Sequence, residues 1–359
     1  DGCDLSHEDF DGPTKLAGWG YFEGSKLWRH FTEGADPSRM RESGADHGTN
    51  CCGVVAAEAD ARHTVGAAPG CALLPVKWES SGDSLHVSDS KILTLLAFVS
   101  KRVDVLSCSW SSTPAARYSE QVVRRIRELS ETGGRRGKGM LFVWAAGNDN
   151  CPIEHRSRVA IPHSSGWQQS ESGEWRWVGV ETSRVFVNTL ARLPGVLHVA
   201  AISSTAQRAL YSNYGAGIDL CAPSSNSHTY DRMPVPGLAI TTTSGEGDPV
   251  ASDFGGTSSA TPLVAGVAAL VLSANPELGA LELASILKRT ASRDLDLTGY
   301  ARTPPTDDDP DTSWDVSPAP PFDRGDFRAI GVAEGTWSPW FGFGKVDAEA
   351  AVREALAER

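Results

Sequence analysis

The sequence lacks the features that mark several common classes of protein. Its 359 residues contain no run of 18 or more apolar residues, so a transmembrane helix is not expected. Basic residues are not in excess: 33 lysines and arginines stand against 45 aspartates and glutamates. The resulting net charge of −12 argues against nucleic acid as a partner. The seven cysteines include no Cys-x-x-Cys pair, which leaves zinc and thioredoxin-like sites without support.

What is present is the composition of an ordinary globular protein. Hydrophobic residues make up 40% and charged residues 22% of the chain, which is enough apolar material for a sizeable core. The length alone suggests two domains, although a single α/β domain can reach this size. An odd number of cysteines leaves at least one thiol unpaired. We interpret most of the cysteines as small buried apolar residues. One disulfide bond through Cys151 is the alternative.

Short apolar runs alternate with helix-spaced segments along the chain. The runs at 103–110 and 139–146 predict buried strands, and apolar spacing predicts helices at 87–99 and 121–129. The repeated order of strand and helix predicts a parallel sheet with crossover helices. The segment at 258–274 is apolar on almost all sides, which predicts a helix in the core. Further strands are expected at 71–78, 195–202 and 238–242, and further helices at 50–62, 281–289 and 346–356.

Two segments have the composition of insertions. Residues 164–178 are polar and rich in tryptophan. Residues 301–326 carry six prolines and an acidic run at 307–309, a composition that opposes helix and sheet and favours an extended loop. We interpret the acidic cluster, which includes Asp311, as a solvated loop rather than a calcium site.

A glycine-rich turn at 255–256 leads to Ser258 at the start of the apolar helix. A helix N-terminus offers unpaired backbone N–H groups and a positive dipole end, which favours an anion such as an acyl-transfer oxyanion. Ser258 is therefore a candidate nucleophile. The alternative is that it only caps the helix, because serine is a preferred N-cap residue.

Two further polar residues stand at the ends of predicted elements. His47 precedes a helix of small residues and would be a suitable general base, although a structural or solvated histidine is the common alternative. Asn148 ends a buried strand, where its side chain would face the ligand crevice of a parallel sheet and could donate to an oxyanion. The alternative for Asn148 is a turn-forming asparagine.

These three segments, in this order, resemble the subtilisin-like serine protease family. The HGT segment at His47 matches the histidine motif, Asn148 the oxyanion asparagine, and Ser258 the nucleophile of Gly-Thr-Ser-x-Ala-x-Pro. The resemblance covers nearly the whole chain and implies one catalytic domain over residues 1–359. It implies a three-layer α/β fold with a mostly parallel sheet. It also implies a serine endopeptidase with an Asp-His-Ser triad that requires no cofactor for catalysis.

Some details resemble the kexin-like proprotein convertases, among them Cys51 and the Ser-Cys-Ser-Trp run that ends at Trp110. Convertases bind basic substrates with acidic residues after this run. Here residues 111–114 are Ser-Ser-Thr-Pro, so dibasic specificity is not expected. Asp149 would favour a basic P1 side chain if it faced the first specificity pocket, and the alternative is a solvated loop carboxylate. The substrate-binding residues that the resemblance implies are Ser109, Trp110, Ser111, Ala146, Gly147 and Asp149.

The chain departs from the family pattern at the third triad member. Aligning Gly2, Asp4 and His7 with the pattern Asp-x-Gly-x-Asp-x-x-His puts the catalytic aspartate one position before Asp1. No apolar strand precedes Asp1 to deliver such an aspartate, so we expect the chain to begin partway through a larger protein. The alternatives are that Asp1 has taken over the role or that the triad is degenerate.

The resemblance also bears on ions and partners. Asp9 matches a calcium-binding position of many family members, so Ca²⁺ is a candidate structural ion, but the segment that would supply its other ligands, 58–66, is short. The implied partners are a protein or peptide substrate and a propeptide. The implied state is a secreted or extracellular monomer, and the unpaired cysteine count leaves an intracellular role as the alternative.

Two other functions compete with a protease. A pseudoprotease that binds extended peptides without cleaving them would be supported by the missing aspartate alone. An α/β-hydrolase-type esterase fits poorly, because Ser258 is not in a Gly-x-Ser-x-Gly elbow and the histidine precedes the serine.

Overall fold

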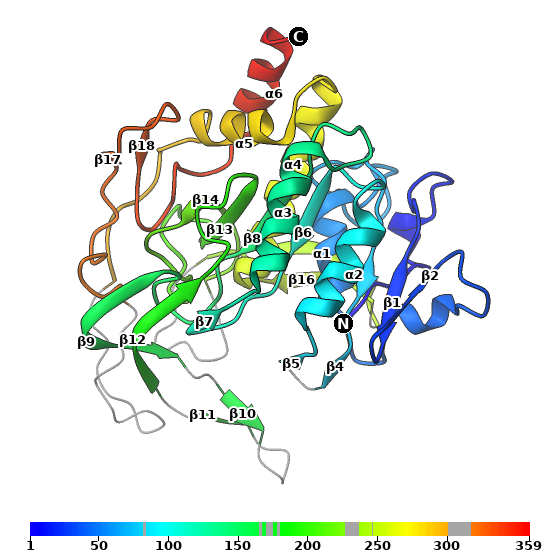
Figure 1. Ribbon diagram of the computed structural model, residues 1–359, viewed down its shortest axis with the longest axis horizontal. Helices are drawn as coiled ribbons and strands as arrows, with labels where there is room; N and C mark the ends of the chain where they lie inside the picture. The colour runs from blue at the N-terminus through cyan, green and yellow to red at the C-terminus, as the bar shows by residue number, and fades with distance from the viewer. Residues whose placement is uncertain are drawn as a thin grey trace.

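A four-stranded parallel sheet forms the centre of the molecule in the computed structural model (Figure 1). The structure describes residues 1–81, 84–164, 167–169, 175–177, 180–226, 237–245, 247–300 and 317–359. The sheet has the order β14-β13-β8-β6, and every pairing in it is parallel. Its strands are β6 (Val105–Cys108), β8 (Leu141–Ala145), β13 (Val196–Ile202) and β14 (Ile218–Pro223). Every residue of β8 and β13 is buried, which confirms the interpretation of their apolar runs as strands covered on both faces.

Helices cover both faces of this sheet. Leu141 and Val143 of β8 belong to a core shared with α4 (Gly256–Ala274), α5 (Ala280–Arg289) and α6 (Ala348–Ala357). The alternate residues Phe142 and Trp144 pack against α2 (Asp89–Val99) and α3 (Glu120–Thr132). Because successive side chains of a strand point to opposite faces, this alternation defines three layers. The predicted three-layer α/β fold is therefore confirmed, with α2 and α3 opposite α4 in Figure 1.

The central helix α4 is long and apolar. By length and hydropathy it is the one helix among the described residues that could cross a membrane. However, 67% of its most apolar window is buried, and it packs against α1 (His47–Ala56), β13 and α6. The prediction of an apolar core helix over this segment is confirmed.

The predicted helix over 50–62 has the wrong bounds. The helix α1 begins at His47 and ends at Ala56. After it the chain turns toward Asp9, whose backbone carbonyl accepts from the Glu58 N–H at 3.1 Å. The Asp9 carboxylate also accepts from the Thr64 backbone and hydroxyl. These tertiary contacts outweigh the helix propensity of the small residues that follow Ala56.

A second, smaller sheet has the order β2-β1-β3 and contains β1 (Gly20–Glu23), β2 (Lys26–Arg29) and β3 (Val76–Lys77). The strand predicted at 71–78 is thus confirmed only at its end. The other strands are β4 (Ser80–Ser81), β5 (Ser84–Leu85), β7 (Ala115–Ala116), β9 (His155–Ser164), β10 (Trp167–Gln169), β11 (Trp175–Trp177), β12 (Val180–Asn188), β15 (Ile240–Thr243), β16 (Val250–Phe254), β17 (Arg328–Ala329) and β18 (Thr336–Trp337), and short 3₁₀ helices span Glu8–Phe10 and Pro37–Met40.

The two predicted insertions are only partly described. Residues 164–178 lie between the antiparallel strands β9 and β12, and within them β10 pairs with β11. Residues 165–166, 170–174 and 178 lie outside the described residues, as do 301–316 with the acidic cluster. Residues 317–326 carry no helix or strand. That the whole chain is one domain stays a prediction.

A cavity of about 1530 Å³ lies between β3 and β6. Each of these strands is at an edge of its sheet in the described part of the chain. The cavity reaches Asp1 and His47 at one end, and much of its wall is apolar. Its apolar lining includes Leu74, Val76, Ile92, Leu95, Leu106 and Ala265.

Candidate active site

Ser258 stands in the first turn of α4. The N-cap of this helix is Gly255, so the interpretation of Ser258 as the cap is wrong. Gly256 has φ +71°, and a Cβ there would come within 3.0 Å of the Asn148 amide nitrogen, which explains glycine at this position. As a first-turn residue, Ser258 has a backbone N–H without an acceptor inside the helix.

The end of β6 lies against the Ser258 segment. The Ser258 hydroxyl donates to the Ser109 carbonyl at 3.4 Å, and the Ser109 hydroxyl donates to the Ser258 carbonyl at 3.0 Å. Among the described residues, the Ser258 hydroxyl therefore donates to the Ser109 carbonyl and not to the His47 imidazole.

His47 is the first residue of α1, and its side chain is 45% exposed. Its ring meets Phe254 edge to face, with centroids 5.6 Å apart. The Cys51 sulfur lies 3.9 Å from His47 Nδ1 and 3.6 Å from the Ser258 carbonyl oxygen, so one thiol touches both segments. Desolvation acts to lower the pKa of His47, but the Cys51 thiol and the Asp46 carboxylate together outweigh it, so that pKa is raised.

Asp1 lies beside His47 without bonding to it. One oxygen of the Asp1 carboxylate is 4.0 Å from His47 Nδ1 and accepts from the Gly48 backbone N–H at 2.9 Å. A Cβ on Gly48 would sit 1.8 Å from the Gly2 carbonyl oxygen, so glycine is what lets the two segments approach this closely.

Asn148 follows β8 and is fixed by Thr257. Its side-chain oxygen accepts from the Thr257 backbone N–H at 2.8 Å and from the Thr257 hydroxyl at 2.9 Å. Because the oxygen is held in this way, the amide nitrogen faces Gly256 at the start of α4. The amide nitrogen and the N-terminus of α4 thus lie together, the arrangement that an oxyanion hole needs.

The expected substrate-binding residues fall into two groups. Ser111 and Ala146 line a small cavity of about 10 Å³, and Gly147, next to it in the chain, has φ +104°. Trp110 packs edge to face on Trp144 with centroids 4.7 Å apart, and with Ser109 and Ser111 it also lines the cavity of about 1530 Å³.

Asp149 is hydrogen-bonded rather than solvated. One oxygen of its carboxylate accepts from the Thr113 hydroxyl at 2.6 Å and from the Asn213 amide at 3.2 Å. Burial raises the pKa of Asp149 in spite of these two donors. The carboxylate therefore ties two loops together, which differs from the solvated side chain considered as the alternative.

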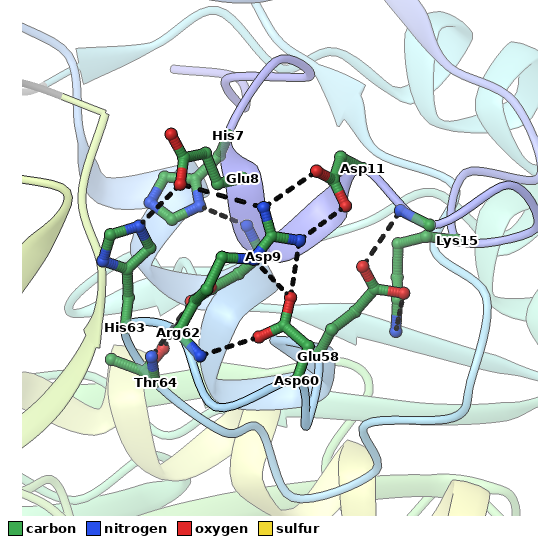
Figure 2. Close-up of polar contacts among 11 residues, drawn as sticks. His7, Glu8, Asp9, Asp11, Lys15, Glu58, Asp60, Arg62, His63 and Thr64 are labelled. Carbon is green, nitrogen blue, oxygen red and sulfur yellow. Dashed lines mark hydrogen bonds and ion pairs between the residues drawn. The ribbon is translucent and has the colours of Figure 1, made fainter.

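The Asp9 region bears on the expected calcium ion (Figure 2). Asp9 is fully buried, and its Oδ2 accepts from the backbone and hydroxyl of Thr64. Its Oδ1 is buried and has no hydrogen-bond donor among the described residues. A buried carboxylate oxygen without a donor fits a hard cation ligand.

A cluster of carboxylates lies near Asp9. Asp11, Glu58 and Asp60 bring one ligand oxygen each within 4.8 Å of the others. Figure 2 shows that the Arg62 guanidinium already pairs with two of them, bidentately with Asp11 at 2.9 and 3.0 Å and with Asp60 at 2.6 Å. Arg62 therefore supplies a positive charge to this exposed cluster, whereas the Asp9 oxygen has none.

The cysteines agree with their interpretation as mostly buried apolar residues, whereas the roles of two polar residues were not predicted. All seven cysteines are free, including Cys151, and four of them are buried. Thr257 stands inside the nucleophile motif, but only the structure shows that it holds Asn148. Asn213, which contacts the loop that carries Asn148, has no motif or spacing that would single it out.

A model of the subtilase family matches residues 1–321 of the chain. A calcium-dependent protease of Trichormus variabilis is 26% identical over 99% of this chain and 45% of its own length. A dibasic-processing endoprotease of Schizosaccharomyces pombe is 27% identical over 99% of this chain and 40% of its own length. The chain thus spans less than half of either relative. Among solved structures, the serine protease of Aeromonas sobria with its chaperone gives a TM-score of 0.61 at 21% identity, covering all of this chain and 59% of the other.

Proposed function

The chain belongs to the subtilase family, and we propose that it is a serine endopeptidase with Ser258 as nucleophile and His47 as general base. The observation that carries this proposal is the meeting of β8 with α4, where Thr257 orients the Asn148 amide toward the helix N-terminus next to Ser258. A preformed pair of donors beside a serine is the part of an acyl-transfer site that a structural serine does not need.

The residues would share the steps of peptide hydrolysis. The Ser258 hydroxyl attacks the peptide carbonyl while His47 takes its proton, and His47 later gives that proton to the leaving amine. The developing oxyanion accepts from the Asn148 amide and from the Ser258 backbone N–H. The Ser258 hydroxyl must exchange the Ser109 carbonyl for the imidazole as its acceptor, a contact that tightens in many enzymes only when substrate binds.

We infer that the triad carboxylate comes from a strand that precedes residue 1 and fills the cavity between β3 and β6. The cavity has an apolar lining, two strand edges face it, and its end is at Asp1 and His47. Buried strand edges need hydrogen-bonding partners, and a parallel strand would supply them on both sides. Asp1 is the competing source, but at 4.0 Å from His47 Nδ1 its carboxylate makes no hydrogen bond.

Labelling with a fluorophosphonate probe tests both proposals. The probe is applied to residues 1–359 and to a version extended upstream by the native residues, with Ser258→Ala as control. Labelling that needs the extension and disappears in the control supports the upstream carboxylate. Labelling of residues 1–359 without the extension assigns the role to Asp1 or to a serine that reacts without a triad carboxylate. Absence of labelling in both folded proteins contradicts the protease and favours a protein that binds peptides without cleaving them.

Substrates of this site would be extended peptides. Residues 109–111 and 146–147 flank Ser258 and Asn148, where a peptide can add to a strand edge by main-chain hydrogen bonds. Residues 111–114 carry no carboxylate, and Asp149 is held by Thr113 and Asn213. We therefore expect no strong preference for a basic P1 side chain, which peptides with Arg, Phe or Leu at P1 would show. Secretion, a propeptide and a monomeric state stay predictions.

We also propose that Ca²⁺ binds at Asp9 and supports the 58–66 segment. The buried Asp9 oxygen without a donor supports this, and so does the name of the Trichormus relative. The ion would stabilise the fold and would take no part in the chemistry at Ser258.

A further inference from the structure

Asn213 lies in the connection between β13 and β14 and is 2% exposed. Its side-chain oxygen accepts from the backbone N–H groups of Asp149 at 3.0 Å and Cys151 at 3.1 Å. Its amide nitrogen donates to the Ala146 carbonyl at 3.0 Å and to the Asp149 carboxylate at 3.2 Å. An asparagine amide offers two donors and two acceptor positions, so all four are used, and all on residues 146–151.

The loop at 146–151 needs external support. It contains two residues with positive φ, Gly147 at +104° and Asn150 at +49°. Residues other than glycine adopt this backbone conformation less readily. Thr257 holds one side of it by accepting from the Gly147 N–H at 3.1 Å and by bonding Asn148. Asn213 holds the other side through its side chain and through its own backbone N–H, which donates to the Gly147 carbonyl at 2.9 Å.

The close approach of Asn213 also accounts for Gly147. A Cβ on Gly147 would come within 2.4 Å of the Asn213 amide nitrogen and 2.8 Å of the Ser111 hydroxyl. A side chain at this position would therefore displace Asn213, the loop, or the wall at Ser111. The glycine and the asparagine form one interlocked unit behind Asn148.

We propose that Asn213 is a positioning residue for the oxyanion hole: through the 146–151 loop it fixes the backbone that presents Asn148. This inference rests on the proposed role of Asn148. Asn213 itself is buried behind the loop, and its bonds go to Ala146, Gly147, Asp149 and Cys151. Oxyanion stabilisation depends on donors that are already in place, and a displacement of about 1 Å can cost about 100-fold in rate.

Asn213→Ala removes these four side-chain bonds and the contact of the Cys151 thiol with the same oxygen at 3.6 Å, and Asn275→Ala is the matched control. Asn275 is also 2% exposed and also bonds through both ends of its amide, to Ala355 and Glu277, but it lies at the far end of α4. We expect kcat on a peptide substrate to fall about 10- to 100-fold in Asn213→Ala with little change in KM. Asn275→Ala should lower the Tm similarly while its kcat stays near wild type.

A double-mutant cycle with Asn148→Leu decides whether Asn213 acts through Asn148. If it does, Asn213→Ala costs much less kcat in the Asn148→Leu background than in the wild type. An equal fold-loss in both backgrounds, or a wild-type kcat in Asn213→Ala, overturns the inference. If Asn148→Leu alone leaves kcat unchanged, the proposed oxyanion role has failed instead.

Hydrogen exchange gives a second readout that needs no turnover. The backbone N–H groups of Asp149 and Cys151 should exchange at least about 10-fold faster in Asn213→Ala and at the wild-type rate in Asn275→Ala. Unchanged exchange at these two positions would contradict the positioning role even in a protein without measurable activity.

Discussion

The two sides of the candidate site differ in how firmly their side chains are held. On one side Asn148 has its oxygen bonded twice to Thr257, and its loop is held by Asn213. On the other side the His47 imidazole has the Asp1 carboxylate at 4.0 Å and the Cys51 sulfur at 3.9 Å, and it borders a cavity of about 1530 Å³. The Asn148 side chain is therefore held by several hydrogen bonds, whereas no carboxylate among the described residues is hydrogen-bonded to the His47 imidazole.

This difference has a structural cause. The Asn148 side is made by β8, α4 and the connection between β13 and β14, which all belong to the central core. The His47 side is formed by α1 and by the chain at Asp1. These two meet at the end of the cavity between β3 and β6. A site residue is held as firmly as the elements behind it, and here the Asn148 side is backed by the packed central core whereas the His47 side borders a cavity.

Replacing Asn148 gives the largest effect that tests the firm side. Asn148→Leu should keep the fold, because the residue is partly exposed and its two hydrogen bonds to Thr257 involve only the first turn of α4, but should lower kcat by about 10²–10³. The loss should appear in kcat rather than KM, since the amide serves the oxyanion. Asn275→Leu at the far end of α4 is the control, measured on the same peptide substrate. A kcat equal to wild type in Asn148→Leu would remove Asn148 from the oxyanion hole.

The fold could be predicted where a buried element has a locally apolar sequence. The strands β8 and β13 are buried along their whole length and most of the helix α4 is buried, so their sequences contain continuous apolar runs. The strand β14 was not predicted, because Asp219 interrupts it. That carboxylate pairs with Lys288 of α5 at 2.6 Å, a long-range partner that no local pattern reveals.

The site could be predicted only as far as its motifs are local. The segments at His47, Asn148 and Ser258 each carry their signal within a few residues, and the structure brings the last two together through Thr257. Asn213 is 65 positions from Asn148 in the chain, and only the connection between the parallel strands β13 and β14 brings it to the loop. Positioning residues of this kind follow from topology, so a single sequence does not identify them.

Calcium offers a smaller effect that tests a region away from both sides. If the buried Asp9 oxygen binds the ion, saturating Ca²⁺ stabilises the fold by about 2.7 kcal/mol at 100 times its Kd. The Tm of the wild type should then rise by several degrees over the chelated protein, while Asp9→Asn should show little response. If the response survives in Asp9→Asn and disappears in Asp60→Asn, the ion belongs to the carboxylate cluster around Arg62 instead.

Replacing Cys51, which lies on the His47 side of the site, gives the smallest expected effect. Desolvation lowers the pKa of His47, and Cys51 is the first of the groups that raise it, ahead of Asp46. A general base must be neutral, so a raised pKa keeps His47 protonated up to a higher pH and moves the acid limb of kcat/KM upward. Cys51→Ala should therefore shift the acid limb to lower pH without a large change in the plateau.

Cys52→Ala is the control for that shift, because the neighbouring thiol contacts Cys3 instead of His47. Both profiles are measured on the upstream-extended protein, so that the triad is the same in each. An acid limb that stays in place or moves upward in Cys51→Ala would show that the thiol does not set the His47 proton affinity. It would follow that Cys51 only packs between α1 and Ser258.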